Sequence, residues 1–146
     1  STGLLLLTND GRLHHRLSHP SFDHEKEYEV KVERPVTDEQ LAKMAAGMPV
    51  LGSRTRPAQV RRLSGRRFRI VLQEGRNRQI RRMARKLGHR VVRLKRIRLS
   101  AVRLGKLAEG QWRYLTNREI NALLAGVGGD VKSTAPDHPG KAQGPE

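Results

Sequence analysis

The sequence predicts an α+β fold, in which helices pack on a mixed, mainly antiparallel sheet. Several short segments alternate apolar and charged residues, as strands with one buried face do. Fewer segments have apolar residues three and four positions apart, the spacing of a helix face. Several neighbouring strand segments are joined by turns too short for a crossover, which favours antiparallel pairing. With 146 residues, the chain is long enough for one domain with a substantial core.

The first part of the chain supplies two strand segments and two helices. Residues 3–8 form an apolar run that predicts a short buried strand, and residues 12–17 predict a brief helix after a turn. Residues 27–32 have the alternation of a half-buried strand. Thr37 is a good N-cap for a helix over residues 38–46, which carries leucine, methionine and alanine on one side.

A hairpin and an arginine-rich helix occupy the middle of the chain. Residues 58–63 and 67–72 predict two strands joined by a Ser-Gly turn. Residues 77–87 predict the next helix, whose apolar side chains are three and four positions apart. Gly88 is expected to end this helix, because glycine readily takes the left-handed conformation found at helix C-termini.

The last part of the chain predicts further strands, a final helix and a tail. The strands are expected at residues 90–95, 97–103 and 111–114. The final helix is expected at residues 117–124, after a capping Thr or Asn. From residue 128 the sequence is rich in Gly, Pro, Lys, Asp and Ser and has no periodicity. Residues 1–127 are therefore predicted to form one domain and residues 128–146 a disordered tail.

The charge balance indicates a polyanionic partner. Lys and Arg total 30 against 14 Asp and Glu, which gives a formal net charge of +16. The arginines are spread through much of the chain, so the basic surface should belong to the folded domain. The alternative is a protein with a basic face that only solvent contacts.

The sequence gives no indication of a metal centre or a membrane segment. It has no cysteine, which excludes disulfides and thiolate metal sites. Four histidines cluster within residues 14–24, but they lack the spacing of a known metal-binding motif, so no metal is expected. The apolar run at residues 4–7 is too short for a signal core or a membrane span. We therefore expect a cytoplasmic protein.

The segment EGRNRQIRRM, residues 74–83, places arginines at the start of a helix after a strand. A helix N-terminus attracts anions through its free N–H groups, and guanidinium groups add to that attraction. Residues 78, 81, 82 and 85 are arginines three or four positions apart, so they form one cationic surface. Their repulsion would be relieved by phosphates or by an active-site carboxylate, although a solvated helix face is the alternative. The following strand is expected to extend this surface with Arg90, Arg93, Lys95, Arg96 and Arg98.

Aromatic side chains are too few for a base-stacking platform of the kind that binds single strands. A binder of this composition would depend on phosphates and shape, unless one aromatic receives a single extruded base. Tyr28 is the candidate, because it lies within a predicted strand and not on a surface loop. Ordinary core packing, with the hydroxyl at the edge of the core, is the alternative for this residue.

Three separated segments together resemble one enzyme family. STGLLLLTNDG, residues 1–11, resembles the second half of the signature G-R-L-D-x-x-[ST]-x-G-L-L-x-L-T-N-[DN]-G. EKEYEV, residues 25–30, is similar to the K-x-Y-x-V segment, and residues 74–83 are similar to G-R-x-[HR]-Q-[IV]-[RK]-R-M. These segments are those of the RsuA-like bacterial rRNA pseudouridine synthases. The strings HEKEY, GMPVLG and NRQ are most similar to the RluF branch, which points to large-subunit rRNA.

The resemblance implies isomerisation of a uridine in ribosomal RNA, in the pseudouridine synthase catalytic fold. The glycosidic N1–C1′ bond breaks and the base reattaches through C5, without a cofactor or metal. In the family an aspartate starts the reaction, as nucleophile or as base at the sugar. By motif position, Tyr28 packs on the flipped base and assists removal of the C5 proton, and Arg81 pairs with the aspartate. Ile70 or Leu72 would line the pocket, leaving the RNA backbone to Arg76, Arg78, Arg82 and Arg85.

One expected catalytic residue is outside this sequence. The family aspartate would fall three positions before Ser1, and no aspartate of the chain occupies that motif position. The family's N-terminal RNA-binding module is not seen either. We therefore expect a polypeptide that starts at Ser1 to lack synthase activity. A monomer is expected.

Two other classes of protein compete with the enzyme. The first is a non-catalytic, basic RNA-binding or ribosome-associated module, which would not have the sequence Gly-Arg-Leu-Asp before Ser1. The second is a DNA-binding protein with a helix-turn-helix, in which the arginine helix would have a helical neighbour. Strands are predicted on both sides of that helix, so the DNA-binding alternative is the weakest.

Overall fold

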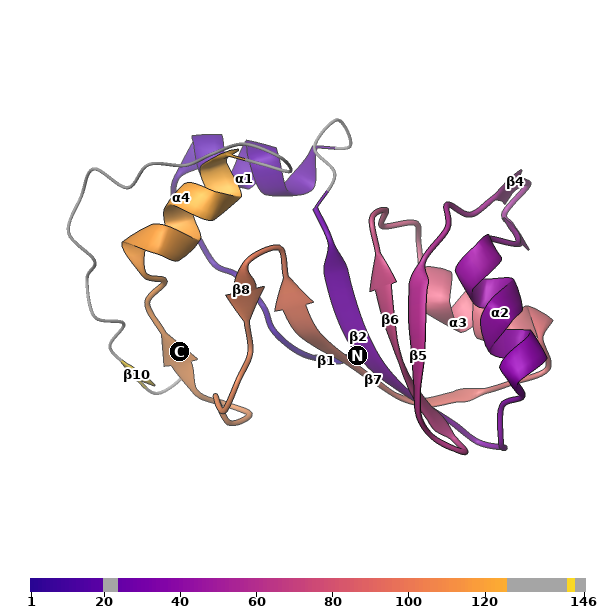
Figure 1. Cartoon of the computed structure of the whole chain (residues 1–146). Helices are drawn as coiled ribbons and strands as arrows, with labels where there is room; N and C mark the ends of the chain where they lie inside the picture. Colours follow the sequence, from indigo (N-terminus) through magenta and orange to yellow (C-terminus); the bar gives the residue numbers. More distant parts are fainter. Residues whose placement is uncertain (20–23, 126–141, 144–146) are drawn as a thin grey trace.

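The computed structural model describes residues 1–19, 24–125 and 142–143 (Figure 1). Its main sheet has the strand order β1-β7-β2-β6-β5, with β8 also paired to β7. The strands are β1 (Thr2–Gly3), β2 (Lys26–Val32), β5 (Gln59–Ser64), β6 (Arg67–Leu72), β7 (Val91–Leu99) and β8 (Val102–Arg103). Only β1 and β7 pair in parallel. The predicted α+β class with a mixed, mainly antiparallel sheet is therefore confirmed.

Four helices are described, two beside each end of the molecule (Figure 1). They are α1 (Gly11–Ser18), α2 (Asp38–Ala46), α3 (Gln79–Lys86) and α4 (Asn117–Ala125). Thr37 caps α2 as predicted and forms a capping box with Gln40, which satisfies N–H groups that a helix start leaves free. Asp10 caps α1 in a similar way, since its carboxylate accepts from two backbone N–H groups.

The larger core lies between one face of the sheet and helices α2 and α3. The sheet contributes alternate residues of β2 and β6, such as Val30 and Phe68, each about 1 % exposed. Helix α2 contributes Leu41 and Met44, and α3 contributes Ile80, Met83 and Ala84. The alternation predicted for β2 and the helical stripe predicted for α3 are both confirmed, because each buries the face that its apolar side chains define.

A second, smaller core lies at the other end, around α1, β8 and α4. Its buried members are Leu13, Val102 and Leu123, and the half-buried Leu4 and Leu6 pack against them. Leu5 and Leu7, in contrast, are 71 % and 84 % exposed. The buried strand predicted at residues 3–8 is therefore wrong in its extent: only Thr2–Gly3 pairs, and the rest of the run lies over the edge of the small core.

Two other boundaries differ from the prediction. The segments expected as separate strands at 90–95 and 97–103 join in the strand β7, which runs without a break past residue 96 because a bulge between its partners for Glu27 and Tyr28 absorbs the break in alternation. The second segment does not extend to residue 103 as one strand: β7 ends at Leu99, and after a turn residues 102–103 form β8, which pairs back on β7. Helix α3 begins at Gln79, two residues later than expected, because Arg78 takes the left-handed conformation. Outside the main sheet, two pairs of two-residue strands are described: β3 (Pro49–Val50) pairs with β4 (Ser53–Arg54), and β9 (Trp112–Arg113) pairs with β10 (Ala142–Gln143).

The remaining sequence predictions fall partly outside the described residues. Of the tail predicted to be disordered, residues 128–146, only β10 is described. In the part of the chain that the structure describes, no helix is long and apolar enough to cross a membrane. Nor do the described residues contain a group of three or more side chains suited to hold a metal ion.

Candidate active site and RNA-binding surface

The three motif segments, which are far apart in the sequence, lie on neighbouring elements of the structure. Strand β1 belongs to the first segment, and β2 carries Tyr28 of the second segment. Strand β7 lies between β1 and β2. The third segment follows β6, the other neighbour of β2, and leads into α3. In the sheet, Tyr28 therefore stands directly between Arg96 of β7 and Ile70 of β6.

The first segment is fixed to β7 by a close backbone approach that only glycine permits. Gly3 has a φ of +102°, and a Cβ on it would lie 2.3 Å from the carbonyl oxygen of Arg96. The next residue, Leu4, donates its N–H to that oxygen at 2.8 Å, and the Arg96 Nε donates to the Leu4 carbonyl at 2.9 Å. The segment that precedes Leu4 is thereby held one strand away from Tyr28.

Tyr28 is half-buried on the core face of the sheet and packs against the larger core. Its hydroxyl has no hydrogen-bond partner among the described residues. Ile70, directly opposite, is fully buried, and Leu72, two positions further along β6, is 4 % exposed. The structure thus brings together Tyr28 and the two apolar residues predicted to line a pocket, although their roles in a reaction stay predictions.

The loop before α3 is organised by Glu74. The Glu74 carboxylate accepts the backbone N–H of Arg56 at 2.7 Å and the Nε of Arg76 at 2.9 Å. Gln79, only 4 % exposed, accepts the Arg76 backbone N–H at 3.2 Å and donates to Glu74 at 3.4 Å. Sequence reasoning missed Glu74 and Gln79 as positioning residues. The Glu-Gly-Arg-x-x-Gln spacing that allows these contacts was the available signal.

Arg76 is held by acceptors of the protein itself. Besides Glu74, its guanidinium donates to the carbonyl oxygens of Val50, Ser53 and Arg54 at 2.9, 3.1 and 2.5 Å. These hydrogen bonds connect the β3–β4 hairpin to the loop before α3. Arg76 was predicted to contact RNA; its observed partners give it a structural role, and an RNA contact stays a prediction.

The other arginines of the third segment and of α3 differ in whether their guanidinium groups have partners within the protein. Arg82 donates to Asn77 through two bonds, at 3.0 Å to the carbonyl and 2.9 Å to the side chain. Arg78, Arg81 and Arg85 make no side-chain hydrogen bond or ion pair with any described residue. Arg78 and Arg85 are exposed, whereas Arg81 is half-buried at the start of α3. A half-buried cation without a counter-charge is unfavourable unless a ligand supplies one.

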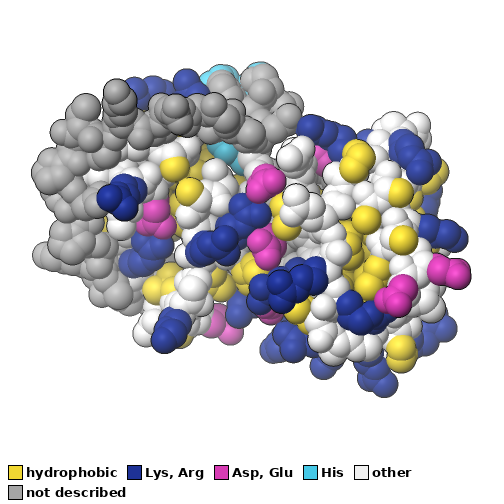
Figure 2. All heavy atoms as spheres, viewed as in Figure 1, with side chains coloured by type: hydrophobic (Ala, Val, Ile, Leu, Met, Phe, Trp, Pro, Cys, Tyr) yellow, Lys and Arg dark blue, Asp and Glu magenta, His cyan; other side chains and the backbone are white. Residues whose placement is uncertain are grey.

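The expectation that the cations of the following strand extend the surface of α3 is wrong for Arg93, Lys95 and Arg98, whereas Arg96 is opposite Tyr28 and so lies on the same face as α3. Tyr28 lies on the face that α2 and α3 cover, and the alternate residues Glu29 and Lys31 lie on the other face. Lys95 is opposite Glu29 and Arg93 is opposite Lys31, so both belong to that other face. Lysine and arginine side chains are spread over the visible surface and outnumber acidic ones there (Figure 2).

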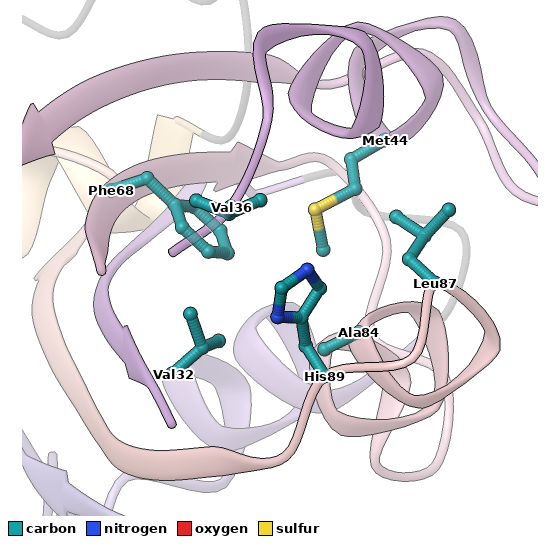
Figure 3. A pocket seen from close by; sticks show the side chains of 7 residues that line it. All are labelled: Val32, Val36, Met44, Phe68, Ala84, Leu87 and His89. Atoms are coloured by element: carbon teal, nitrogen blue, oxygen red, sulfur yellow. The ribbon is translucent and has the colours of Figure 1, made fainter. Parts of the chain in front are cut away.

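A depression between α2, α3 and the sheet does not provide a substrate site. Met44, Phe68, Ala84 and other apolar side chains surround the His89 ring (Figure 3) and leave no space for a water molecule. The His89 Nε2–H donates to the Gln40 Oε1 at 2.7 Å, while its Nδ1 is buried without a partner among the described residues. Burial, and secondarily the charge of Arg34, lower the pKa of His89.

The fold and these side chains define a basic α+β domain, whose site combines a half-buried tyrosine with arginines suited to an RNA backbone. Comparison with known proteins makes this assignment specific. Residues 1–86 match the RNA pseudouridylate synthase family, and the chain belongs to this family. The matched residues include all three motif segments, so the predicted resemblance is confirmed.

Individual relatives agree with the family match. The chain is 41 % identical to the dual-specificity RNA pseudouridine synthase RluF of Salmonella typhi over 136 residues, which is 93 % of this chain and 47 % of the relative. It is 39 % identical to the ribosomal small subunit pseudouridine synthase A of Salmonella typhimurium over 126 residues, 84 % of this chain and 54 % of that protein. The chain spans about half the length of these relatives.

A solved structure supports the fold directly. A crystal structure of a pseudouridylate synthase superimposes with a TM-score of 0.79 at 38 % identity, covering 83 % of this chain and 54 % of that one.

The RluF protein of Escherichia coli K12 is 43 % identical over 124 residues, 85 % of this chain and 43 % of the relative. The predicted similarity to the RluF branch is therefore confirmed.

Proposed function

We propose that this chain is the catalytic part of a pseudouridine synthase that isomerises a uridine in ribosomal RNA. The observation that carries the proposal is the position of Tyr28 between strands β7 and β6. Strand β7 pairs with β1 of the first motif segment, and β6 leads into the third segment. The first and third segments of the family pattern thus lie on opposite sides of the strand that carries this half-buried aromatic side chain. The names of the relatives also support an RNA substrate, and ribosomal RNA in particular.

Arg81 is proposed to hold the catalytic aspartate in its charged form. The family pattern places that aspartate three positions before Ser1, in the segment that leads into β1. A guanidinium close to a carboxylate lowers the carboxylate pKa and fixes its direction. Among the described residues Arg81 has no other partner, which is consistent with a cation kept for this carboxylate.

Tyr28 is proposed to receive the flipped uracil. A base buried in a stack must be extruded before its glycosidic bond can be attacked, at a cost of a few kcal/mol. Stacking on the tyrosine ring and contact with Ile70 or Leu72 would offset part of this cost. The Tyr28 hydroxyl, which no described residue engages, would then be able to assist removal of the C5 proton after the base has reattached.

The RNA backbone is proposed to lie along the exposed side of the loop and of α3. Arg78 and Arg85 are exposed and without side-chain partners among the described residues, so their guanidinium groups are available to phosphates. Arg82 is oriented by Asn77 and would act from a fixed position. Action in the cytoplasm as a monomer is part of the same proposal.

Release of tritium from C5-tritiated uridine in a ribosomal RNA fragment tests this function. Two polypeptides should be compared: the one that starts at Ser1, and one that includes the preceding residues with the motif aspartate. We expect release only with the longer polypeptide. If neither releases tritium while both bind the RNA with similar affinity, the alternative of a non-catalytic RNA-binding module is correct.

A further inference from the structure

On the face of the sheet opposite Tyr28, three cations stand side by side on three adjacent strands. Lys31 of β2 is directly opposite Arg93 of β7 on one side and Arg67 of β6 on the other. All three side chains are exposed. Like charges directly opposite in a sheet are destabilising, by a few tenths to about 1 kcal/mol for each pair. This row is therefore unfavourable for the isolated domain.

The next row on this face adds three cations and one carboxylate. Reading across β7, β2, β6 and β5, its members are Lys95, Glu29, Arg69 and Arg61. Glu29 accepts from Arg69 at 3.0 Å and from Arg67 at 3.5 Å. Lys31, Arg61, Arg93 and Lys95 form no ion pair with any described residue. The six cations and Glu29 are called the sheet-face patch below.

The composition of the patch indicates the kind of partner that it fits. No described helix lies over it, and the residues that share its face include no aromatic side chain. A surface without aromatic groups is unsuited to stacking unpaired bases. Arginine and lysine side chains in two rows are suited to phosphates, and four strands at a spacing of about 4.8 Å make the patch about 14 Å wide.

The other end of the same face limits the patch. There Arg98 donates to Glu27 at 3.0 Å and to Glu25 at 3.2 Å, and the exposed Arg103 of β8 is directly opposite Arg98. Two carboxylates therefore balance two cations at this end. The excess of positive charge lies at the end of the face that holds Lys31.

We propose that the sheet-face patch binds the sugar-phosphate backbone of a second RNA duplex segment, separate from the segment that presents a uridine to Tyr28. The sheet itself lies between the two surfaces, so a small hairpin held at Tyr28 would not reach the patch. A larger structured RNA, in which neighbouring helices pack together, would contact both. The proposal rests on the proposed function for the RNA held at Tyr28, but binding at the patch itself does not require isomerase activity.

The test compares two triple variants of the full chain by fluorescence anisotropy over a range of salt concentrations. The first variant combines Lys31→Gln, Arg67→Gln and Arg93→Gln. The control combines Lys43→Gln, Arg103→Gln and Lys106→Gln, which removes three exposed cations outside the patch. The probes are a short hairpin, a multi-helix ribosomal RNA fragment, and a single-stranded RNA as long as the fragment.

With the multi-helix fragment, the patch variant should lower the slope of log affinity against log salt by about 2 to 3, since each phosphate contact contributes about 0.9. The control variant should leave this slope unchanged, and neither variant should alter binding of the short hairpin. An unchanged slope for the patch variant would overturn the proposal. Equal losses on the single-stranded RNA would overturn its assignment to a duplex.

Thermal unfolding checks that the variant is folded and that the row is repulsive. Removing the three charges should leave the Tm of the domain unchanged or raise it, because the like-charge contacts disappear. A lower Tm would contradict the electrostatic premise. Tritium release from a short hairpin by the longer polypeptide reports the proposed function separately, so failure of one proposal can be distinguished from failure of the other.

Discussion

Glu74 and Arg76 form an ion pair, with 2.9 Å between Oε1 and Nε, that fixes the loop before α3. Both side chains are largely buried, and the remaining donors of Arg76 bind three carbonyl oxygens of the β3–β4 hairpin. The pair thus connects the hairpin to the segment that presents Arg78 and Arg81. The arginine-rich helix start depends on this connection for its position.

Arg76→Ala is expected to destabilise the domain by about 1–3 kcal/mol, because several carbonyl groups and the Glu74 carboxylate lose their donor. Urea unfolding measures the change. Arg85→Ala is the matched control and should stay within about 0.5 kcal/mol of the wild type, since Arg85 is exposed and has no described partner. Equal stabilities of the two variants would show that the Arg76 contacts carry little energy.

Arg81→Ala, in the polypeptide that includes the motif aspartate, should lower the single-turnover rate about a hundredfold or more while retaining most RNA affinity. The reason is that the aspartate loses the charge that keeps it ionised and oriented. Arg81→Lys keeps a positive charge and should recover part of the rate. Wild-type turnover in Arg81→Ala would remove this residue from the site.

Arg78→Asn should weaken RNA binding and reduce its salt slope by about 1, as expected for one lost phosphate contact. Asparagine is preferred to alanine here because Arg78 has a φ of +50°, a conformation that asparagine tolerates well. Fluorescence anisotropy at several salt concentrations measures the slope. If the slope does not change, Arg78 contacts no phosphate.

Gly3→Ala should disrupt the attachment of the first motif segment to β7. A Cβ at this position would lie 2.3 Å from the Arg96 carbonyl oxygen, and the φ of +102° is strained for alanine. We expect a loss of more than about 1 kcal/mol in urea unfolding. Gly11→Ala is the control, because a Cβ there meets nothing within 4 Å; its stability should be unchanged or slightly higher.

His89 should make the stability of the domain depend on pH below neutrality. Its folded-state pKa lies below the ordinary value of 6.5, so between these two values the unfolded chain binds more protons. Stability is therefore complete above pH 6.5 and falls as the pH decreases towards the folded-state pKa. Urea unfolding between pH 5 and 7 should show this decrease in the wild type and a smaller one in His89→Gln, which has no titrating ring; identical curves would contradict the assignment.

The sequence predicted well those features that depend on local periodicity. Strand β2, helix α2 with its Thr37 cap, and the β5–β6 hairpin are all found close to the expected residues, since each has a clear apolar face or turn. The position of Tyr28 beside β6, the strand that leads into the third segment, was predictable only through the family motifs. Local patterns do not specify which strands become neighbours.

Other features could not be predicted because they depend on register and tertiary contacts. The bulge in β7 decides which side chains of that strand share a face with Glu27 and Tyr28, and arginine spacing alone does not reveal it. The apolar run at residues 4–7 indicated a buried strand, yet Leu5 and Leu7 are exposed because β1 is short and lies at the sheet edge. The internal partners of Arg76 likewise come from a hairpin more than twenty residues away.

The most direct test of the central claim is tritium release from a ribosomal RNA fragment labelled at C5 of its uridines. With the polypeptide that includes the motif aspartate, we expect release that ends when a specific uridine has been converted. Arg81→Ala should greatly slow this release. No release from that polypeptide, under conditions in which it binds the fragment, would contradict the assignment of the site around Tyr28 to uridine isomerisation.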